Sequence, residues 1–181
     1  MTVVANTLSW SDPFEQLRVG HTFRTGRRSV CETDVIVFSA LTGDWHPQHT
    51  DAGWAARGPF GEQIAHGMLT LSLAVGLVPL DPERVLALRR VGDVVFKRPV
   101  RLGESIGVDG EIITLKPLDD RAGLVEFGWA VRNQDDALVC RASVGVLWRR
   151  APQPLERRRA SFWHDPITAG AAPGEFVPVP L

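Results

Sequence analysis

Acidic and imidazole side chains cluster in one short loop of the sequence, GDWHPQHTD. The loop contains Asp44, His46, His49 and Asp51. His66 and Gly67 then open the longest apolar segment of the chain. Imidazole titrates close to neutral pH, so a histidine beside a carboxylate can both take up and return a proton. A glycine that opens a helix also presents a free backbone N–H to an anion. These residues therefore indicate acid–base chemistry beside a site for negative charge.

Simpler roles for the same residues remain open. Asp44 could cap the turn that follows Gly43, and Asp51 could cap the turn after it. His49 could be a loop histidine whose ring is satisfied by the backbone. Histidines with a nearby carboxylate are also the usual ligands of zinc. Because the spacing matches none of the helical metal motifs, we expect no bound metal.

Two helical patterns flank the loop and must position it. Residues 32–43 carry apolar side chains at helical spacing, with a cap at Glu32 or Thr33 and a stop at Gly43. From Gln63 onward the chain is apolar nearly all round, which predicts a core helix rather than a surface helix. The first helix would deliver the chain into the polar loop, and the second would anchor its far end.

Strand patterns make up most of the remaining chain. A first strand is expected between Phe14 and Val30. Alternation of apolar and polar residues then predicts four strands, at 85–100, 106–115, 124–133 and 138–150. A turn at 133–136 joins the last two into a hairpin. One core helix against a curved, largely antiparallel sheet is an α+β fold.

Length and composition suit one compact domain in a reducing compartment. With 181 residues and 44% hydrophobic content, the chain can bury a core without staples. We expect a domain over residues 1–150 and a Pro/Arg-rich tail over 151–181. The net charge of −1 argues against nucleic acid, and no apolar run reaches the roughly 20 residues of a membrane span. Cys31 and Cys140 fit no disulfide framework and the start lacks a secretory signal, so we expect a cytoplasmic protein.

Three stretches resemble one known family. GDWHPQHTD, GPFGEQIAHGMLTLSL and VVFKRPVRLGES are similar to the MaoC-like dehydratases, also called (R)-specific enoyl-CoA hydratases. That family's pattern is Asp, any residue, Asn, Pro, any residue, His, and then an apolar helix opened by Ala-His-Gly. The most specific matches are Asp44, Pro47, His49, His66 and Gly67. The resemblance covers roughly residues 14–149 and implies a single hotdog domain, in which a curved antiparallel sheet wraps a central helix.

The resemblance also implies a function. Members of the family reversibly hydrate a 2-enoyl thioester to a 3-hydroxyacyl thioester, so the chain would be a lyase. Asp44 and His49 would hold the water, and the Gly67 N–H would stabilise the charge that develops on the thioester oxygen. CoA or phosphopantetheine would enter as part of the substrate, without a separate cofactor. The family further implies a homodimer or higher oligomer, in which the sheets of two chains join.

Five more side chains are candidates for contact with the substrate. His46 stands where the family usually has Asn. We therefore expect this residue to be the first place where substrate shape or activity differs from the rest of the family. Trp45 could line the acyl pocket, and His66 ties the loop to the start of the helix. Lys97 and Arg98 suit the phosphates of the carrier, although an ordinary solvated strand edge has the same composition.

Two other functions remain open at this point. A thioesterase could use the same scaffold, because hotdog domains serve several thioester chemistries. The chain could also be a non-catalytic acyl-binding subunit of a heteromeric hydratase, because His46 departs from the family pattern. The sequence has no glycine-rich phosphate loop, nucleophile elbow or dinucleotide fingerprint.

Overall fold

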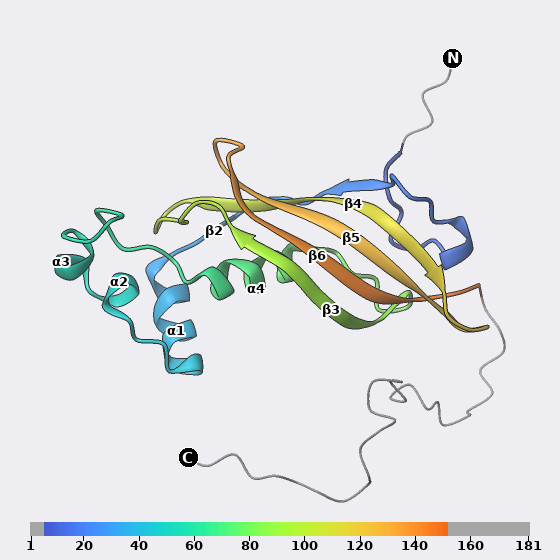
Figure 1. Ribbon diagram of the computed structural model, residues 1–181, viewed down its shortest axis with the longest axis horizontal. Helices are drawn as coiled ribbons and strands as arrows, with labels where there is room; N and C mark the ends of the chain where they lie inside the picture. The colour runs from blue at the N-terminus through green and yellow to red at the C-terminus, as the bar shows by residue number, and fades with distance from the viewer. Residues whose placement is uncertain (1–5, 152–181) are drawn as a thin grey trace, which may run out of the picture.

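An antiparallel sheet of six strands forms the main layer of the molecule (Figure 1). The computed structural model describes residues 6–151, so the predicted tail lies outside the described residues except for Ala151. The strands are β1 (Thr22–Arg24), β2 (Arg28–Ser29), β3 (Val85–Phe96), β4 (Ser105–Pro117), β5 (Ala122–Asn133) and β6 (Leu138–Arg149). Their order is β1-β4-β5-β6-β3, and β2 also pairs with β4. The domain boundary at residue 150 stays a prediction.

Side-chain alternation along the long strands sends one face of the sheet into the core. In β5 the buried residues include Val125, Phe127, Trp129 and Val131. In β6 the facing residues Val144, Val146 and Trp148 are also buried. This pairing joins the two inward faces across the sheet, as the alternating pattern predicts.

Helix α4 (Gly67–Leu77) packs on this buried face of the sheet. Its buried side chains Leu69, Leu71 and Ala74 belong to the same apolar cluster as Ile112 of β4. Figure 1 shows α4 running along one side of the sheet, which confirms the predicted α+β arrangement. The helix is not buried all round, however, because Met68, Ser72 and Gly76 form an exposed stripe at helical spacing.

Three helices lie together beyond one end of the sheet (Figure 1). They are α1 (Glu32–Thr42), α2 (Pro47–Thr50) and α3 (Ala52–Ala55). Helix α1 ends where predicted, at Gly43, which adopts a left-handed conformation with φ of 80°. Its predicted cap is wrong, because the helix begins after Cys31, whose N–H donates to Asp34 Oδ2 at 3.0 Å.

The apolar pattern starts at Gln63, but the core helix begins at Gly67, the residue that was expected to open it. The segment just before the helix pairs as a strand does. The Ala65 N–H donates to the Val100 carbonyl at 2.8 Å. Ile64 forms an isolated bridge with Arg101 in the same place. The apolar pattern alone did not reveal this pairing. Its consequence is that His66 and Gly67 lie at the junction of an extended segment and a helix.

The strand predicted between Phe14 and Val30 is also replaced by shorter elements. Phe14–Gln16 form a single 3-10 turn, and only the short strands β1 and β2 follow. Gly20, with φ of 89°, turns the chain before β1, a conformation that glycine adopts at little cost.

The later strands match their predictions more closely. The turn at 133–136 joins β5 to β6, and the Asn133 side chain accepts from the Asp135 and Ala137 N–H groups. The register of β3 against β6 shifts after Gly92. Glycine is common at such bulges in a strand. Among residues 6–151, no helix is long and apolar enough to cross a membrane.

Candidate active site

Asp44 lies in the turn between α1 and α2, directly after the left-handed Gly43. One carboxylate oxygen, Oδ1, accepts from the His46 N–H at 3.2 Å, so the predicted capping role of Asp44 is partly met. The other oxygen, Oδ2, lies 3.9 Å from Nε2 of His66. The side chain is 52% exposed, so this second oxygen remains available to a water or a substrate.

His49 projects from the short helix α2 into the interior and is only 9% exposed. Its Nδ1 lies 2.7 Å from the Ile64 carbonyl, and because a carbonyl only accepts, Nδ1 carries the hydrogen. This leaves Nε2 as the basic atom of the neutral ring. Burial lowers the pKa of His49 below its usual 6.5, and His66 and His46 lower it further. The Ile64 hydrogen bond and the Asp44 carboxylate oppose that shift. His49 is therefore a neutral base near pH 7.

His66 is the last residue before α4 and is 3% exposed. Its ring stacks on the His49 ring, with centroids 3.8 Å apart and an interplanar angle of 29°. Its Nε2 lies 3.1 Å from the Asp44 backbone carbonyl and 3.3 Å from Oγ of Ser39. His66 therefore contacts both members of the predicted catalytic pair.

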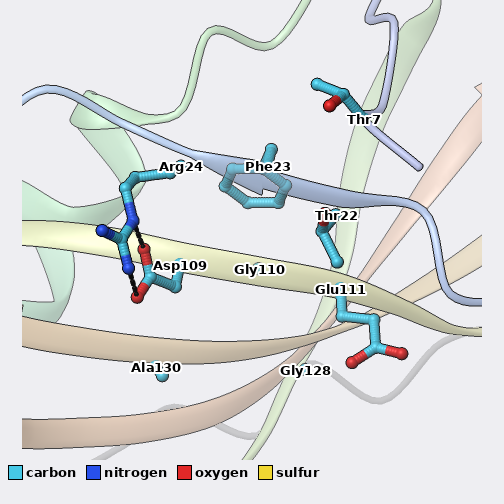
Figure 2. A pocket seen from close by; sticks show the side chains of 9 residues that line it. All are labelled: Thr7, Thr22, Phe23, Arg24, Asp109, Gly110, Glu111, Gly128 and Ala130. Carbon is cyan, nitrogen blue, oxygen red and sulfur yellow. Dashed lines mark hydrogen bonds and ion pairs between the residues drawn. The ribbon is translucent and has the colours of Figure 1, made fainter. Parts of the chain in front are cut away.

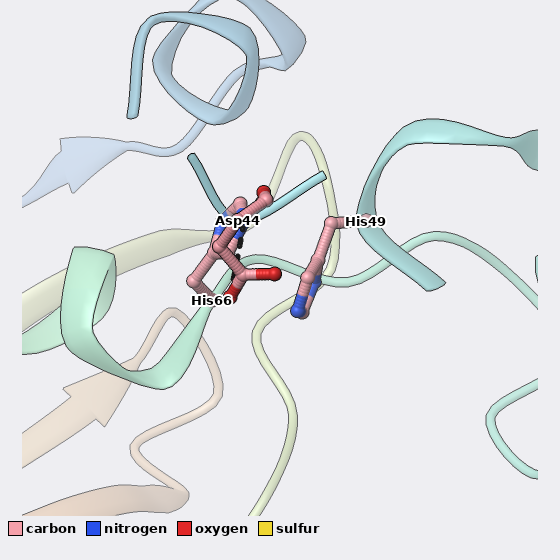
Figure 3. A group of neighbouring side chains, drawn as sticks. All are labelled: Asp44, His49 and His66. Atoms are coloured by element: carbon pink, nitrogen blue, oxygen red, sulfur yellow. Dashed lines mark hydrogen bonds and ion pairs between the residues drawn. The ribbon is translucent and has the colours of Figure 1, made fainter. Parts of the chain in front are cut away.

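Asp44, His49 and His66 thus form one compact group, although they come from three separate segments (Figure 3). One nitrogen or oxygen from each lies within 4.8 Å of the others. Nε2 of His66 is also engaged by backbone and hydroxyl oxygens. The donor types are those that zinc binds, and the expectation of no bound metal stays a prediction.

Comparison with known proteins shows the family of the chain. A family model described as a MaoC like domain matches residues 14–125. The chain belongs to the MaoC-like dehydratase family. It is 36% identical over 114 residues to a 3-hydroxybutyryl-CoA dehydratase of Methylorubrum extorquens, a match that covers 61% of this chain and 70% of that relative.

Solved structures agree with the family assignment. The R-hydratase PhaJ1 of Pseudomonas aeruginosa is 30% identical, with a TM-score of 0.63 over 77% of this chain and 86% of that chain. A Mycobacterium tuberculosis protein with a double hotdog fold is 20% identical, with a TM-score of 0.69 over 80% of this chain and 46% of that chain. The second likeness bears on the fold alone. The predicted hotdog fold and MaoC-like family are confirmed.

His46 occupies the position where MaoC-like dehydratases usually have Asn, and it performs the capping function of an amide. Its Nδ1 accepts from the Gln48 N–H at 3.2 Å, so His46 is the N-cap of α2. Asparagine is among the preferred residues at such a cap. Its ring also meets Trp54 edge-to-face at 5.3 Å between centroids. The departure from the family pattern therefore preserves the local hydrogen bond, while it adds a larger ring beside the site.

Gly67 is the first residue of α4, so its N–H has no partner within the helix. The phenyl ring of Phe96 fills the space beside it, since an added Cβ would lie 2.8 Å from Cε2 of that ring. A side chain at this position would therefore displace the Phe96 ring, which is 45% exposed. The free N–H follows directly after His66 in the chain, where the oxyanion donor was predicted.

The other predicted substrate contacts lie around this group without joining it. Trp45 is 52% exposed and follows Asp44 in the turn. Lys97 and Arg98 are exposed and follow Phe96, the residue that covers Gly67. The Arg98 guanidinium donates to the Leu138 carbonyl at 2.9 Å. Asp51 caps α3 by accepting from the Trp54 N–H at 2.8 Å, as predicted.

Some residues that shape the site were not predicted. Ser39 of α1 is fully buried and reaches His66, and the Ile64 carbonyl fixes the tautomer of His49. Gln63 also donates from Nε2 to the His49 carbonyl at 2.9 Å. A serine on the inward side of an apolar helix was the one signal available for Ser39. Backbone groups such as the Ile64 carbonyl have no signature in side-chain types.

A hollow on the sheet lies apart from this group (Figure 2). It is lined by Thr7, Thr22, Phe23, Arg24, Asp109, Gly110, Glu111, Gly128 and Ala130. An ion pair between Arg24 and Asp109, with Nε and Oδ1 2.6 Å apart, crosses one side of it. None of the predicted site residues lines this hollow, and it contains no histidine or cysteine. We therefore assign the chemistry to the group around His49.

Proposed function

We propose that this MaoC-like dehydratase adds water reversibly to a 2-enoyl thioester with Asp44 and His49, and that the Gly67 N–H binds the thioester oxygen. The observation that carries the proposal is that His49, whose Nδ1 is bonded to the Ile64 carbonyl and whose Nε2 is free, lies in one compact group with Asp44, next to the start of α4. Family membership supports the hydratase and dehydratase class of enzyme. The residue roles are our proposal.

In the hydration direction, His49 Nε2 takes a proton from a water molecule while the water oxygen bonds to C3 of the substrate. Asp44 accepts the other hydrogen of that water and so orients it. The electron pair of the double bond moves toward the thioester, where the Gly67 N–H stabilises the charge on oxygen. The acid form of the pair then returns a proton to C2. Dehydration follows the same steps in reverse.

The substrate carries its own carrier group, CoA or phosphopantetheine, and we infer no further cofactor. The exposed Lys97 and Arg98 lie where the chain leaves Phe96, so the phosphates of the carrier would meet them outside the site. We also propose that no metal takes part. Full activity after dialysis against a chelator supports this, and activity restored only by added zinc contradicts it.

Loss of enoyl-CoA absorbance tests the proposal in single variants. We expect Asp44→Asn and His49→Ala each to lower kcat by at least about a hundredfold, because each removes one side of the water site. Circular dichroism of both variants controls for folding. Hydration retained in both variants contradicts the residue roles. Thiol release from acyl-CoA without loss of enoyl absorbance favours a thioesterase, and an inactive wild-type chain favours a non-catalytic subunit.

We further propose a homodimer formed along β3. This strand lies at one end of the sheet and pairs only with β6 among the described strands. Its apolar side chains remain exposed, with Leu88 at 48%, Val91 at 38% and Phe96 at 45%. An open edge with exposed apolar residues favours pairing with another chain. Because Phe96 also covers Gly67, this interface would adjoin the oxyanion donor.

We infer a cytoplasmic location from the same residues that suggested it. Cys31 and Cys140 are both free thiols, and burial raises the pKa of the Cys140 thiol. Thiols of this kind are typical of a reducing compartment. Fractionation of cells that express the chain tests this location.

A further inference from the structure

His66 is enclosed by side chains from two other segments of the site. Its ring contacts the His49 ring at 3.8 Å between centroids, and the Phe38 ring of α1 lies 5.0 Å away. With 3% of its surface exposed, it has almost no contact with solvent. A buried polar side chain in such a place needs hydrogen-bond partners, and its partners define its role.

Only one of the two ring nitrogens of His66 has such partners. Nε2 lies 3.1 Å from the Asp44 carbonyl, which requires a hydrogen on Nε2 because a carbonyl cannot donate. Oγ of Ser39 lies 3.3 Å from the same nitrogen. Nδ1 is buried and has no partner among the described residues. A second proton on Nδ1 would therefore be a buried donor without an acceptor, which is costly.

We propose that His66 is a positioning residue that holds both members of the catalytic pair with one side chain. Nε2–H of His66 fixes the backbone of Asp44, and the face of its ring fixes the ring of His49. Ser39 holds the His66 ring from α1. This inference rests on the proposed function, in which Asp44 and His49 share one water molecule.

The stacked arrangement also affects which form of His49 is present. Two imidazoles in face-to-face contact cannot both be protonated without repulsion in a buried site. The titratable groups that act on His49 are His66, Asp44 and His46, and of these His66 has the largest effect. The stacked His66 ring lowers the pKa of His49 and so disfavours its protonation. His66 thus helps to keep Nε2 of its neighbour free to accept a proton.

Two substitutions separate the hydrogen bond from the ring contact. His66→Gln keeps an N–H donor toward the Asp44 carbonyl but removes the ring. His66→Phe keeps an aromatic ring against His49 but removes the donor. Small errors in the placement of reacting groups commonly reduce rates by up to about a hundredfold. We expect kcat to fall about tenfold or more in each variant, with KM changed less than about twofold.

The pH profile gives a result that a purely structural role would not give. In His66→Gln, the acid limb of kcat/KM should move toward higher pH, because His49 no longer has an imidazole stacked on it. Proton NMR titration of the His49 ring should show the same upward shift without any substrate. Wild-type kcat and an unshifted titration in both variants would overturn the inference.

A measurement on the wild-type chain covers the case in which the variants fold poorly. Nitrogen-15 NMR of the five histidines distinguishes the two neutral tautomers of each ring. We expect His66 with hydrogen on Nε2 and His49 with hydrogen on Nδ1. Hydrogen on Nδ1 of His66 overturns the inference. If the wild-type chain hydrates no enoyl thioester, the proposed function is wrong, while these spectra still decide the role of His66.

Discussion

Burial makes His49 an effective base at neutral pH. A fully exposed histidine is partly protonated there, whereas burial lowers the pKa of His49 below 6.5. The hydrogen bond from Nδ1 to the Ile64 carbonyl then directs the remaining lone pair, on Nε2, away from the backbone. One backbone carbonyl and a shielded position thus define both the state and the direction of the proposed base.

The same shift makes stability depend on pH. The unfolded chain protonates His49 near pH 6.5 and the folded chain only at lower pH, so the unfolded state binds more protons between these two pKa values. The free energy of unfolding should therefore decrease as the pH falls below about 6.5. Urea denaturation at several pH values measures this, with His49→Gln as the control. An equally steep decrease in that variant would show that another group is responsible.

The Gly67 N–H can be tested with a matched pair of substitutions. Gly67→Ala and Gly67→Pro both introduce a Cβ against Phe96, but only proline removes the N–H. Proline is tolerated at the first position of a helix, and His66, with φ of −59° and ψ of 142°, suits a residue before proline. We expect kcat of Gly67→Pro to be about 10²–10³-fold below that of Gly67→Ala. Equal rates in the two variants would exclude the donor role.

At the scale of elements, the short helix α2 carries His49 and depends on its cap. A helix of four residues has little stability of its own, and the His46 ring satisfies one of its free N–H groups. The position of the proposed base is therefore linked to the residue that departs from the family pattern.

We expect His46→Asn to keep this cap and His46→Ala to lose it. Asparagine should leave the free energy of unfolding unchanged or higher, while alanine should lower it by about 1 kcal/mol. Hydratase activity should follow the same order, because the loss of the cap loosens the helix that carries His49. Chemical denaturation and steady-state kinetics of both variants measure this. Equal effects of the two substitutions would show that the ring, rather than the cap, matters.

Much of this arrangement of elements could be predicted from sequence, and the exceptions have a common cause. Helix α1 with its stop at Gly43, the hairpin of β5 and β6, and the grouping of Asp44 with His49 all follow from local patterns or the family motif. The strand-like pairing before α4 and the role of Ser39 depend on partners far along the chain. Ala65 pairs with Val100, and Ser39 meets His66, 27 residues away. Local side-chain types do not encode such contacts.

At the scale of the whole molecule, the edge of the sheet indicates how two chains could assemble. β3 is a long strand whose outer edge is unpaired among residues 6–151, and it continues into the segment beside Gly67. Pairing of two such edges would extend the sheet and cover Leu88, Val91 and Phe96 together. Assembly and catalysis would then be connected through Phe96.

A lysine on this edge should disrupt the proposed dimer. Leu88→Lys places a charge at a residue that is 48% exposed in the single chain, and lysine on an edge strand opposes pairing. Leu118→Lys is the matched control, because Leu118 is 42% exposed but lies beyond the end of β4. Sedimentation should show a smaller species only for Leu88→Lys, with reduced hydratase activity. A monomeric and active wild-type chain would contradict this assembly.

The shared handling of one water molecule by Asp44 and His49 is the central claim, and a double-mutant cycle tests it most directly. The values to compare are kcat/KM for enoyl-CoA hydration by wild type, Asp44→Asn, His49→Gln and the double variant. Residues that act as a unit have strongly non-additive effects. We predict that the double variant is within about tenfold of the slower single variant. A loss equal to the product of the two single losses, or a single variant with wild-type rate, would contradict the claim.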